Sequence, residues 1–378
     1  MKMTTMWLAV LGWLMVVSVA TAQTLEKVDV FVGGENGYFA YRIPSLITTK
    51  AGTLLAFCEG RKKSLSDDGD HDLVLRRSTD YGRTWQKLQL VYEQGGDAVV
   101  TIGNPTAVVD QSTGRVWLSM IRNNIAVFDV LITFSDDDGV SWAPVKDITA
   151  LASRPSWGFY ALGPGVGIQI TRGPHRGRLV LPAYHRETKD RKGPSTSHVV
   201  YSDDHGQTWQ LGGNIGLHTN ECQLVETVTG DGSELLINMR NKWAESGGRP
   251  ELAGRRLVSR SRDGGATWSE PVRDEQLIEP NCQASLIRFA WPGDQEKSVL
   301  LFANPDHLLK RHRTTVRASF DEGKTWPMSR LIDGWSGYTG LTRLADGRIG
   351  LIYERERDPQ RITFVAIRLD SLSATPAQ

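Results

Sequence analysis

The sequence STDYGRTW at residues 78–85 occurs five times along the chain in closely related forms. Every copy has serine first, aspartate third, glycine fifth and tryptophan last; the others are SDDDGVSW (135–142), SDDHGQTW (202–209), SRDGGATW (261–268) and SFDEGKTW (319–326). The copies begin 57, 67, 59 and 58 residues apart. A regular period of this length indicates a repeat architecture, and the chain has room for about six such units.

Between the copies, the sequence is typical of short strands. Segments such as GRVWLSM (114–120), FDVLITFS (128–135) and ELLINMR (234–240) are rich in β-branched or aromatic residues and bounded by turn formers. No long stretch has the 3.6-residue period of a helix. About four strands fit into each unit, and four-stranded sheets repeated radially form a β-propeller. We therefore predict an all-β fold, a six-bladed β-propeller, as a single domain over residues 23–378.

The repeated phrase itself has a structural explanation. Its aspartate can accept backbone N–H groups, its glycine can supply a positive φ, and its tryptophan can pack beneath the turn. Five nearly interchangeable copies cannot supply the different residues that one active site needs. We therefore expect the phrase to be a turn between two strands of a blade, and the function to depend on residues that occur once.

The first 22 residues predict a cleavable signal peptide. Lys2 precedes the apolar run WLAVLGWLMVVSV (7–19), and the small residues 20–22 form a cleavage site. The run is short for a membrane span, so we expect a secreted or periplasmic mature chain with no membrane span. Lys2 is the only charged residue removed, which leaves equal numbers of acidic and basic residues. This balance argues against a nucleic-acid partner.

The phrase resembles the Asp box of sialidases (neuraminidases), which are six-bladed propellers. Asp boxes also occur in other propellers and in non-enzymatic proteins, so residues outside the boxes must support the resemblance. YRIPSL (41–46) is similar to the Arg-Ile-Pro motif of sialidases, and this implies that Arg42 binds the substrate carboxylate. The guanidinium is always charged and binds a carboxylate through two parallel hydrogen bonds. A surface arginine beside an edge proline is the alternative.

Two further segments imply the remaining arginines. NECQLVETVTGDGSELLINMR (220–240) resembles a sialidase segment that begins with a functional glutamate, here Glu221, and ends with the second arginine, Arg240. Glu226 is the competing acid. RHRTTVRASFDEGKTW (311–326) implies Arg311 as the third arginine. Arg313 stands where sialidases usually have asparagine, and because alternate residues of a strand share a face, it remains a second candidate.

The segment GYTGL (337–341) resembles the nucleophile region of sialidases, which makes Tyr338 the implied nucleophile. Glu354, in LIYERER (351–357), matches a carboxylate that orients the first arginine. A tyrosine that caps a glycine-rich loop is the alternative explanation.

The loop EGRKKSLSDDGDHDLVLRR (59–77) resembles the first-blade loop of lysosomal-type sialidases. The resemblance implies Asp67 as the acid/base, with Arg61 lining the same pocket, although nearby aspartates compete for the role: Asp68, Asp70 and Asp72. Clustered carboxylates could instead bind calcium, but the loop lacks the EF-hand spacing. Weaker matches place Asn104 and Tyr184 beside the pocket for the arms of the sugar.

The resemblance covers roughly residues 30–370 and implies an exo-α-sialidase, a glycoside hydrolase that releases terminal sialic acid from glycans, glycoproteins or glycolipids with retention of configuration. It implies no cofactor and no metal, and no strong His/Cys ligand cluster is seen in the sequence. Two alternatives remain: a non-catalytic propeller that binds sialoglycans, and a variant that transfers sialic acid or prefers a deaminated form.

Overall fold

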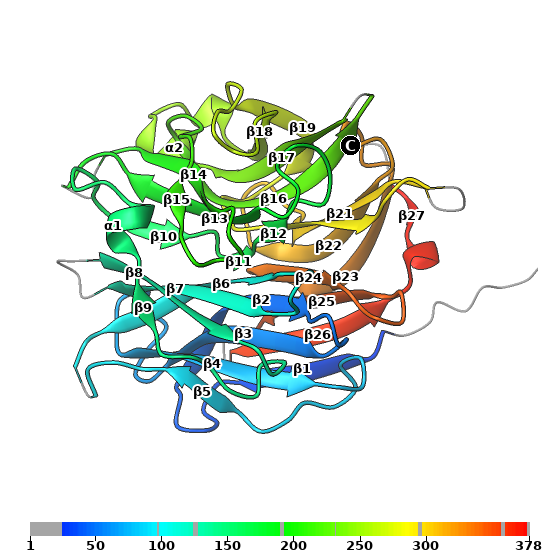
Figure 1. Cartoon of the computed structure of the whole chain (residues 1–378). Coiled ribbons are helices and arrows are strands. Elements are labelled where there is room, and N and C mark those ends of the chain that lie inside the picture. Colours follow the sequence, from blue (N-terminus) through cyan, green and yellow to red (C-terminus); the bar gives the residue numbers. More distant parts are fainter. Residues whose placement is uncertain are drawn as a thin grey trace, which may run out of the picture.

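The computed structural model describes residues 25–375 apart from 97, 124–127, 190–192, 231, 294–296 and 357–359. The predicted signal peptide therefore lies outside the described residues. The fold is all-β, as predicted, and its antiparallel sheets are arranged as a β-propeller (Figure 1). The described helices are short: α1 Thr149–Ala152, α2 Trp243–Ser246, and the 3₁₀ turns η1 Pro250–Leu252 and η2 Leu369–Ser371.

The strands form five hydrogen-bonded sheets. The first contains β1 Lys27–Val32, β24 Thr339–Arg343, β25 Ile349–Arg355 and β26 Arg361–Ile367. The second contains β2 Ala40–Thr48, β3 Leu54–Arg61, β4 His71–Ser78, β5 Gln89–Tyr92, β6 Thr101–Val109, β7 Val116–Asn123, β8 Phe128–Ser135, β9 Lys146–Asp147 and β11 Gly165–Val166. The third contains β10 Tyr160–Leu162, β12 Ile168–Gln169, β13 Leu179–Arg186, β14 Ser195–Ser202 and β15 Gln210–Leu211. The fourth contains β16 Thr219–Thr229, β17 Gly232–Asn241, β18 Arg255–Ser261 and β19 Val272–Ile278. The fifth contains β20 Ser285–Ala290, β21 Val299–Pro305, β22 His312–Ser319, β23 Met328–Trp335 and β27 Ser373–Ala374.

The predicted six blades are not seen as six sheets: the described strands form five, so the sequence-based number of blades is not confirmed. The second sheet has nine strands, because two antiparallel runs, β2–β5 and β6–β9, are joined through β4 and β6. The junction is a single parallel pair, His71 with Thr101. One such bridge at the ends of two strands is enough to merge two four-stranded units into one continuous hydrogen-bonded sheet.

The ring is closed by strands from the two ends of the chain. β1 pairs antiparallel with β26, with Lys27 opposite Val365 and Val32 opposite Arg361. Pairing β1 with β26 covers strand edges that would otherwise be open to association with other chains.

The five repeated phrases are turns between the two outer strands of a unit, as predicted: β4–β5, β8–β9, β14–β15, β18–β19 and β22–β23. Each uses the same hydrogen bonds. In the third copy, Ser202 Oγ donates to Asp204 Oδ1 (2.8 Å) and accepts from Gly206 N (2.8 Å), while Thr208 N (2.9 Å) and Oγ1 (2.6 Å) donate to the Asp204 carboxylate. The carboxylate thus satisfies donors inside the turn, which is a structural role.

The glycine of each phrase also packs against a neighbouring unit. A Cβ atom on Gly206 would lie 2.2 Å from the Trp117 ring of β7, and one on Gly139 would lie 2.8 Å from Leu55 of β3. Both glycines have positive φ, 87° and 80°. Glycine is therefore favoured at this position for two reasons: the backbone has positive φ, and the neighbouring unit leaves no room for a Cβ atom.

We predict that Gly206→Ala lowers the free energy of unfolding by about 2–5 kcal/mol, because left-handed strain adds to overpacking. Gly347→Ala is the matched control, since Gly347 has φ 84° but a Cβ there would meet nothing within 4 Å. Gly347→Ala should therefore lower the free energy of unfolding only by the cost of the left-handed conformation, about 1–2 kcal/mol. Urea unfolding measures both. Equal losses would show that contact between the units contributes nothing at this turn.

Candidate active site

A polar pocket lies at one end of the innermost strands. It brings together residues from many separate stretches of the chain, among them Asp67, Asn104, Tyr184, Glu221, Arg240 and Tyr338. Arg42, Arg311 and Glu354 line an adjoining pocket, and Arg240 borders both. The ten residues singled out by the sequence therefore gather in one region: Arg42, Arg61, Asp67, Asn104, Tyr184, Glu221, Arg240, Arg311, Tyr338 and Glu354.

Irregular backbone aims several of these side chains. The ladder between β2 and β3 shifts register between Arg42 and Ser45, and similar shifts follow Gly103 in β6 and Thr219 in β16. Ile43 and Asn104 have φ of 58° and 52°. A β-branched residue at positive φ is a genuine outlier, and bulges of this kind often occur beside active sites, where they redirect a side chain.

Tyr338 lies at the centre of the site and is buried. Its hydroxyl donates to Glu221 Oε1, and Arg240 Nη1 lies 3.2 Å from the same hydroxyl and 2.7 Å from Glu221 Oε2. Burial and the Glu221 carboxylate raise the pKa of Tyr338 well above its usual value, while Arg240, Arg311 and Arg42 act in the opposite direction. The phenol therefore has a hydrogen-bonded carboxylate acceptor and three nearby cations.

The guanidiniums surround this tyrosine. The Arg42 and Arg311 Cζ atoms lie 5.2 Å and 5.3 Å from the centre of the Tyr338 ring. Arg42 donates through Nε and Nη2 to both oxygens of Glu354, at 3.0 Å and 3.2 Å. Glu354 also accepts the Ile43 and Tyr338 N–H groups. The buried Glu354 thus fixes both the first arginine and the loop that carries the tyrosine.

The structure separates Arg311 from Arg313. Arg311 faces Tyr338, whereas Arg313 lines a different groove together with Arg317. The reason is local: Arg313 has φ 63°, and the ladder between β22 and β23 shifts register just after it. The strand alternation that would have placed the two side chains on one face is broken there.

Asp67 lies at the rim of the site with its side chain 79% exposed. Its Oδ1 accepts from Arg42 Nη1 (3.2 Å) and Arg61 Nη2 (3.0 Å). Arg61 is fully buried and also donates to the Leu65 and Ser66 carbonyls, so it holds the loop that carries Asp67. Partial loss of hydration beside the protein raises the pKa of the Asp67 carboxyl, but Arg42 and Arg61 outweigh this and hold the pKa below its usual value.

The neighbouring aspartates have other partners. Asp70 and Asp72 pair with Lys62 Nζ at 3.0 Å and 3.2 Å, and Asp68 accepts from Asn123. Over the described residues, no group of three or more His, Cys, Asp or Glu side chains is arranged to hold a metal ion. These three aspartates therefore have partners outside the catalytic pair of Arg42 and Arg61.

The sequence interpretation missed three residues of the site. Glu59, buried on β3, binds Arg61 Nη2 at 2.7 Å and accepts the Asn104 N–H at 3.0 Å. Lys242 lines the pocket, and Asn281 Oδ1 accepts from Arg240 Nε at 2.6 Å. Glu59 and Lys242 each lie two residues from an identified arginine, so the period of a strand could have found them. No sequence signal pointed to Asn281.

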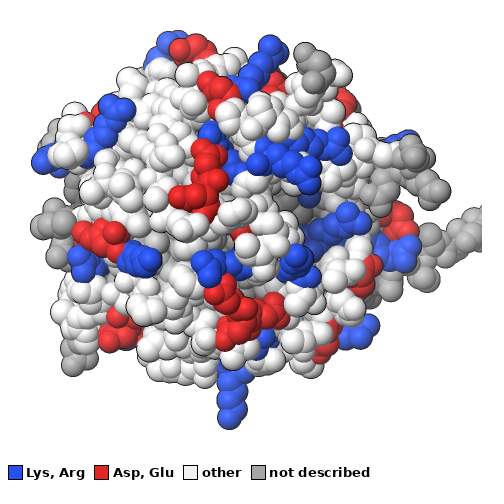
Figure 2. All heavy atoms as spheres, viewed as in Figure 1, with Lys and Arg blue, Asp and Glu red and all other residues white. Residues whose placement is uncertain are grey.

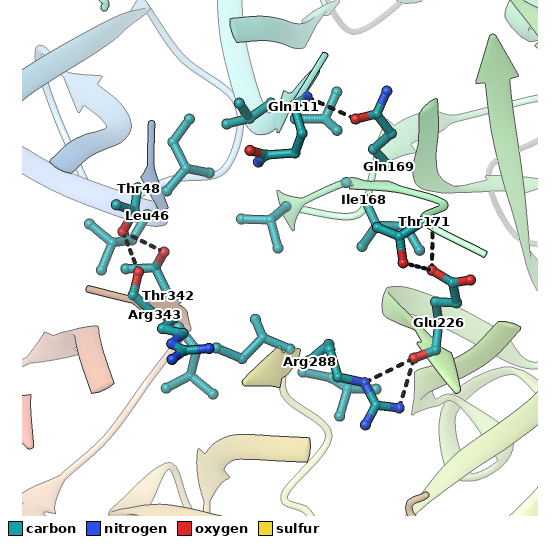
Figure 3. A pocket seen from close by; sticks show the side chains of 18 of the residues that line it. Leu46, Thr48, Gln111, Ile168, Gln169, Thr171, Glu226, Arg288, Thr342 and Arg343 are labelled. Carbon is teal, nitrogen blue, oxygen red and sulfur yellow. Dashed lines mark hydrogen bonds between the residues drawn. The ribbon is translucent and has the colours of Figure 1, made fainter. Parts of the chain in front are cut away.

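Figure 3 shows a second cavity, lined by the opposite ends of several innermost strands. Glu226 lies here, and its carboxylate accepts Thr171 N (2.7 Å), Thr171 Oγ1 (2.8 Å) and Arg172 N (2.9 Å). Five residues of β16 separate Glu226 from Glu221, roughly 17 Å along a strand. Glu226, the competing acid, therefore belongs to a different cavity and satisfies backbone donors there.

Comparison with known proteins agrees with this geometry. A BNR repeat-like domain matches residues 52–351. A sialidase of Micromonospora viridifaciens is 34% identical over 86% of this chain, which spans about half of that protein (51%). The solved Hadza microbial sialidase Hz136 is 31% identical in sequence. The two structures match with a TM-score of 0.80, and the match covers 92% of this chain and 69% of the Hz136 chain. The chain belongs to the sialidase family of glycoside hydrolases. An intramolecular trans-sialidase from Ruminococcus gnavus, 20% identical with a TM-score of 0.77 over 92% of this chain and 98% of its own, shares the fold.

On the side of this sialidase-family chain that Figure 2 shows, acidic and basic side chains are mixed. Figure 2 shows Lys and Arg interspersed with Asp and Glu, with several basic side chains beside a hollow. Among the described residues, no helix is long and apolar enough to cross a bilayer.

Proposed function

We propose that the chain is an exo-α-sialidase that hydrolyses terminal sialic acids with retention, through a covalent intermediate on Tyr338. One observation carries the proposal: the Tyr338 hydroxyl is hydrogen-bonded to a buried glutamate in the midst of three arginines. The substrates we propose are sialylated glycans, glycoproteins or glycolipids.

The arginines suit the carboxylate of sialic acid. Like charges held close together in a partly buried site repel each other, so the cluster is best explained by an anionic ligand. Arg311 supports this most directly: of the three, it alone has no hydrogen bond or ion pair to a carboxylate among the described residues. We therefore propose that Arg42, Arg240 and Arg311 bind the substrate carboxylate together, with Arg42 held in place by Glu354.

A tyrosine nucleophile fits the charge of this sugar. Sialic acid carries its carboxylate on the anomeric carbon, so an attacking aspartate or glutamate would approach a like charge. A phenol avoids this repulsion but must lose its proton as it attacks, because its usual pKa is about 10. Glu221 is the hydrogen-bonded acceptor of that proton, and Arg240 stabilises the negative charge as it forms.

Asp67 is our proposed acid/base. In the free protein, Arg42 and Arg61 keep the pKa of its carboxyl low. When the substrate carboxylate pairs with Arg42, the cationic field at Asp67 weakens and its pKa rises. Binding thereby favours the protonated form, which donates to the departing glycosidic oxygen. The resulting carboxylate then activates water, which attacks the anomeric carbon and breaks its bond to the Tyr338 oxygen, so that the phenol is regenerated.

We also propose that the propeller has six blades, with the nine-stranded sheet contributing two. The packing of Gly139 of the β8–β9 turn against Leu55 of β3 supports this, because the same kind of contact joins Gly206 to Trp117 between two separate sheets.

Export through cleavage of residues 1–22, and hence a secreted or periplasmic location, remains our proposal from the sequence.

The test is the stereochemistry of the first product. We expect the purified protein to release sialic acid from 3′-sialyllactose, and proton NMR at early times to show the α-anomer before mutarotation. An initial β-anomer would contradict the tyrosyl intermediate, and no release from 2,3-, 2,6- or 2,8-linked sialosides would favour a non-catalytic glycan binder. Release of an anhydro sugar would indicate intramolecular transfer, the activity in the names of two neighbours that share this fold. Transfer of sialic acid to lactose would instead indicate intermolecular transfer.

A further inference from the structure

A second groove, away from the catalytic tyrosine, is rich in arginine. It lies between the fourth and fifth sheets and is lined by Arg255 of β18, Arg313 and Arg317 of β22, and Arg330 of β23. Asp306 is the only acidic residue in its lining. Two of these arginines are paired with carboxylates: Arg317 with Asp306 at 2.7 Å and Arg255 with Glu275 at 3.7 Å. Arg313 adds a positive charge that neither of these carboxylates balances.

Arg313 is held in an unfavourable conformation for its residue type. Its φ of 63° is the left-handed region, which favours glycine and asparagine over arginine. The conformation is fixed by its own carbonyl, which accepts from Asp306 N (3.0 Å) and Thr315 Oγ1 (2.9 Å). The exposed guanidinium makes no hydrogen bond or ion pair in the part of the chain that the structure describes. Strained residues often occur at ligand-binding sites, and the guanidinium of this one has no partner among the described residues. We take this as an indication that it binds an external anion.

Arg317, which lines the same groove, is a second and independent observation. Its side chain is 2% exposed and pairs with Asp306 through Nη2 at 2.7 Å. Its Nη1 is buried and has no hydrogen-bond partner among the described residues. Because Arg317 already uses Asp306, the groove has no second carboxylate to balance Arg313, and an unsatisfied buried donor adds to the cost.

The groove lies close to the catalytic region along the chain. Arg311, which faces Tyr338, precedes Arg313 by two residues, and Leu308 of the same loop lines the groove while Leu309 lines the pocket beside Arg311. A span of two strand residues is roughly 7 Å. One segment, 306–313, therefore borders both sites.

We propose that this groove is an accessory subsite for a second oxyanion, a carboxylate or a sulfate ester, on the glycan that enters the active site. The substrate class rests on the proposed sialidase function. Arg313 and Arg255 are the rim residues that would bind the oxyanion, and Arg317 supplies further positive charge below them. A charge-assisted bond from a guanidinium to either anion has the geometry and strength required.

The test uses Arg313→Asn and Arg255→Gln, with Arg368→Gln as a control on an exposed arginine outside the groove. Asparagine tolerates positive φ, so the first variant should fold. For hydrolysis we expect KM for disialyllactose to rise about ten- to a hundredfold in both groove variants, since loss of one charged hydrogen bond has that effect. KM for a fluorogenic monosialoside should not change, and the control should match the wild type with both substrates.

A binding measurement separates this proposal from the proposed function. NMR titration with sulfated lactose, which carries no sialic acid, reports on the groove even if the protein hydrolyses nothing. Weaker binding in the groove variants supports the proposal and indicates a sulfate ester, whereas an effect confined to disialyllactose supports it and indicates a carboxylate. If Arg313→Asn and Arg255→Gln both match the wild type with both probes, the subsite proposal is overturned.

Discussion

Tyr338→Phe is expected to lower kcat for sialoside hydrolysis by roughly 10⁴-fold or more, because loss of a catalytic nucleophile has an effect of that order. The substitution removes only the hydroxyl that Glu221 and Arg240 contact. The phenyl ring remains between Arg42 and Arg311 and stays packed with Ile43 and Cys282. Steady-state kinetics with a fluorogenic sialoside, which needs little acid assistance, measure the loss of attack alone.

Binding should survive this substitution, since the three arginines are untouched. We therefore expect the affinity of Tyr338→Phe for a non-hydrolysable sialic acid analogue to stay within a few-fold of the wild-type value. Tyr353→Phe is the matched control: Tyr353 is also buried, and its hydroxyl bonds to Asp333 at 2.8 Å, outside the site. Turnover of Tyr338→Phe near that of the control would refute the tyrosyl mechanism.

Much of the fold could be predicted because the repeated turns are local in sequence. The Ser, Asp, Gly and Thr of one turn lie within seven residues and form the same bonds each time, so the pattern reads directly as structure. The merging of two units into one sheet could not be predicted. It depends on one backbone pair, His71 with Thr101, that no side-chain pattern encodes.

The candidate site was predictable where a residue belongs to a distinctive motif, and ambiguous where strand alternation had to decide. Arg42, Glu221 and Tyr338 meet as the motifs implied. Strand alternation could not distinguish Arg311 from Arg313, because the left-handed conformation of Arg313 breaks the two-residue period. That conformation could not be predicted, since arginine is not a residue type that favours positive φ. Asn281 was missed for the same kind of reason: it contacts Arg240 from a loop, where no period applies.

Beneath the site, a fully buried ion pair is expected to govern stability. Arg256 and Glu279 are 0% and 1% exposed and 2.8 Å apart. Arg256 also donates to Asn238 Oδ1 (2.6 Å) and to the Cys282 carbonyl (2.7 Å), while Glu279 accepts the Asn241 N–H (2.7 Å). Cys282 packs against Tyr338, so the pair also supports the floor of the site.

We predict that Arg256→Met lowers the free energy of unfolding by about 3–5 kcal/mol, because it leaves the Glu279 carboxylate buried without its cation. Adding Glu279→Gln should recover much of that loss, since the neutral amide no longer needs a counter-charge. Arg368→Met, which breaks the exposed pair with Asp370, should cause no measurable change. Urea unfolding of the three variants measures the differences. If the double variant proves less stable than Arg256→Met by a further large step, the unpaired charge is not the cause, and the loss must instead come from the hydrogen bonds to Asn238 and Cys282.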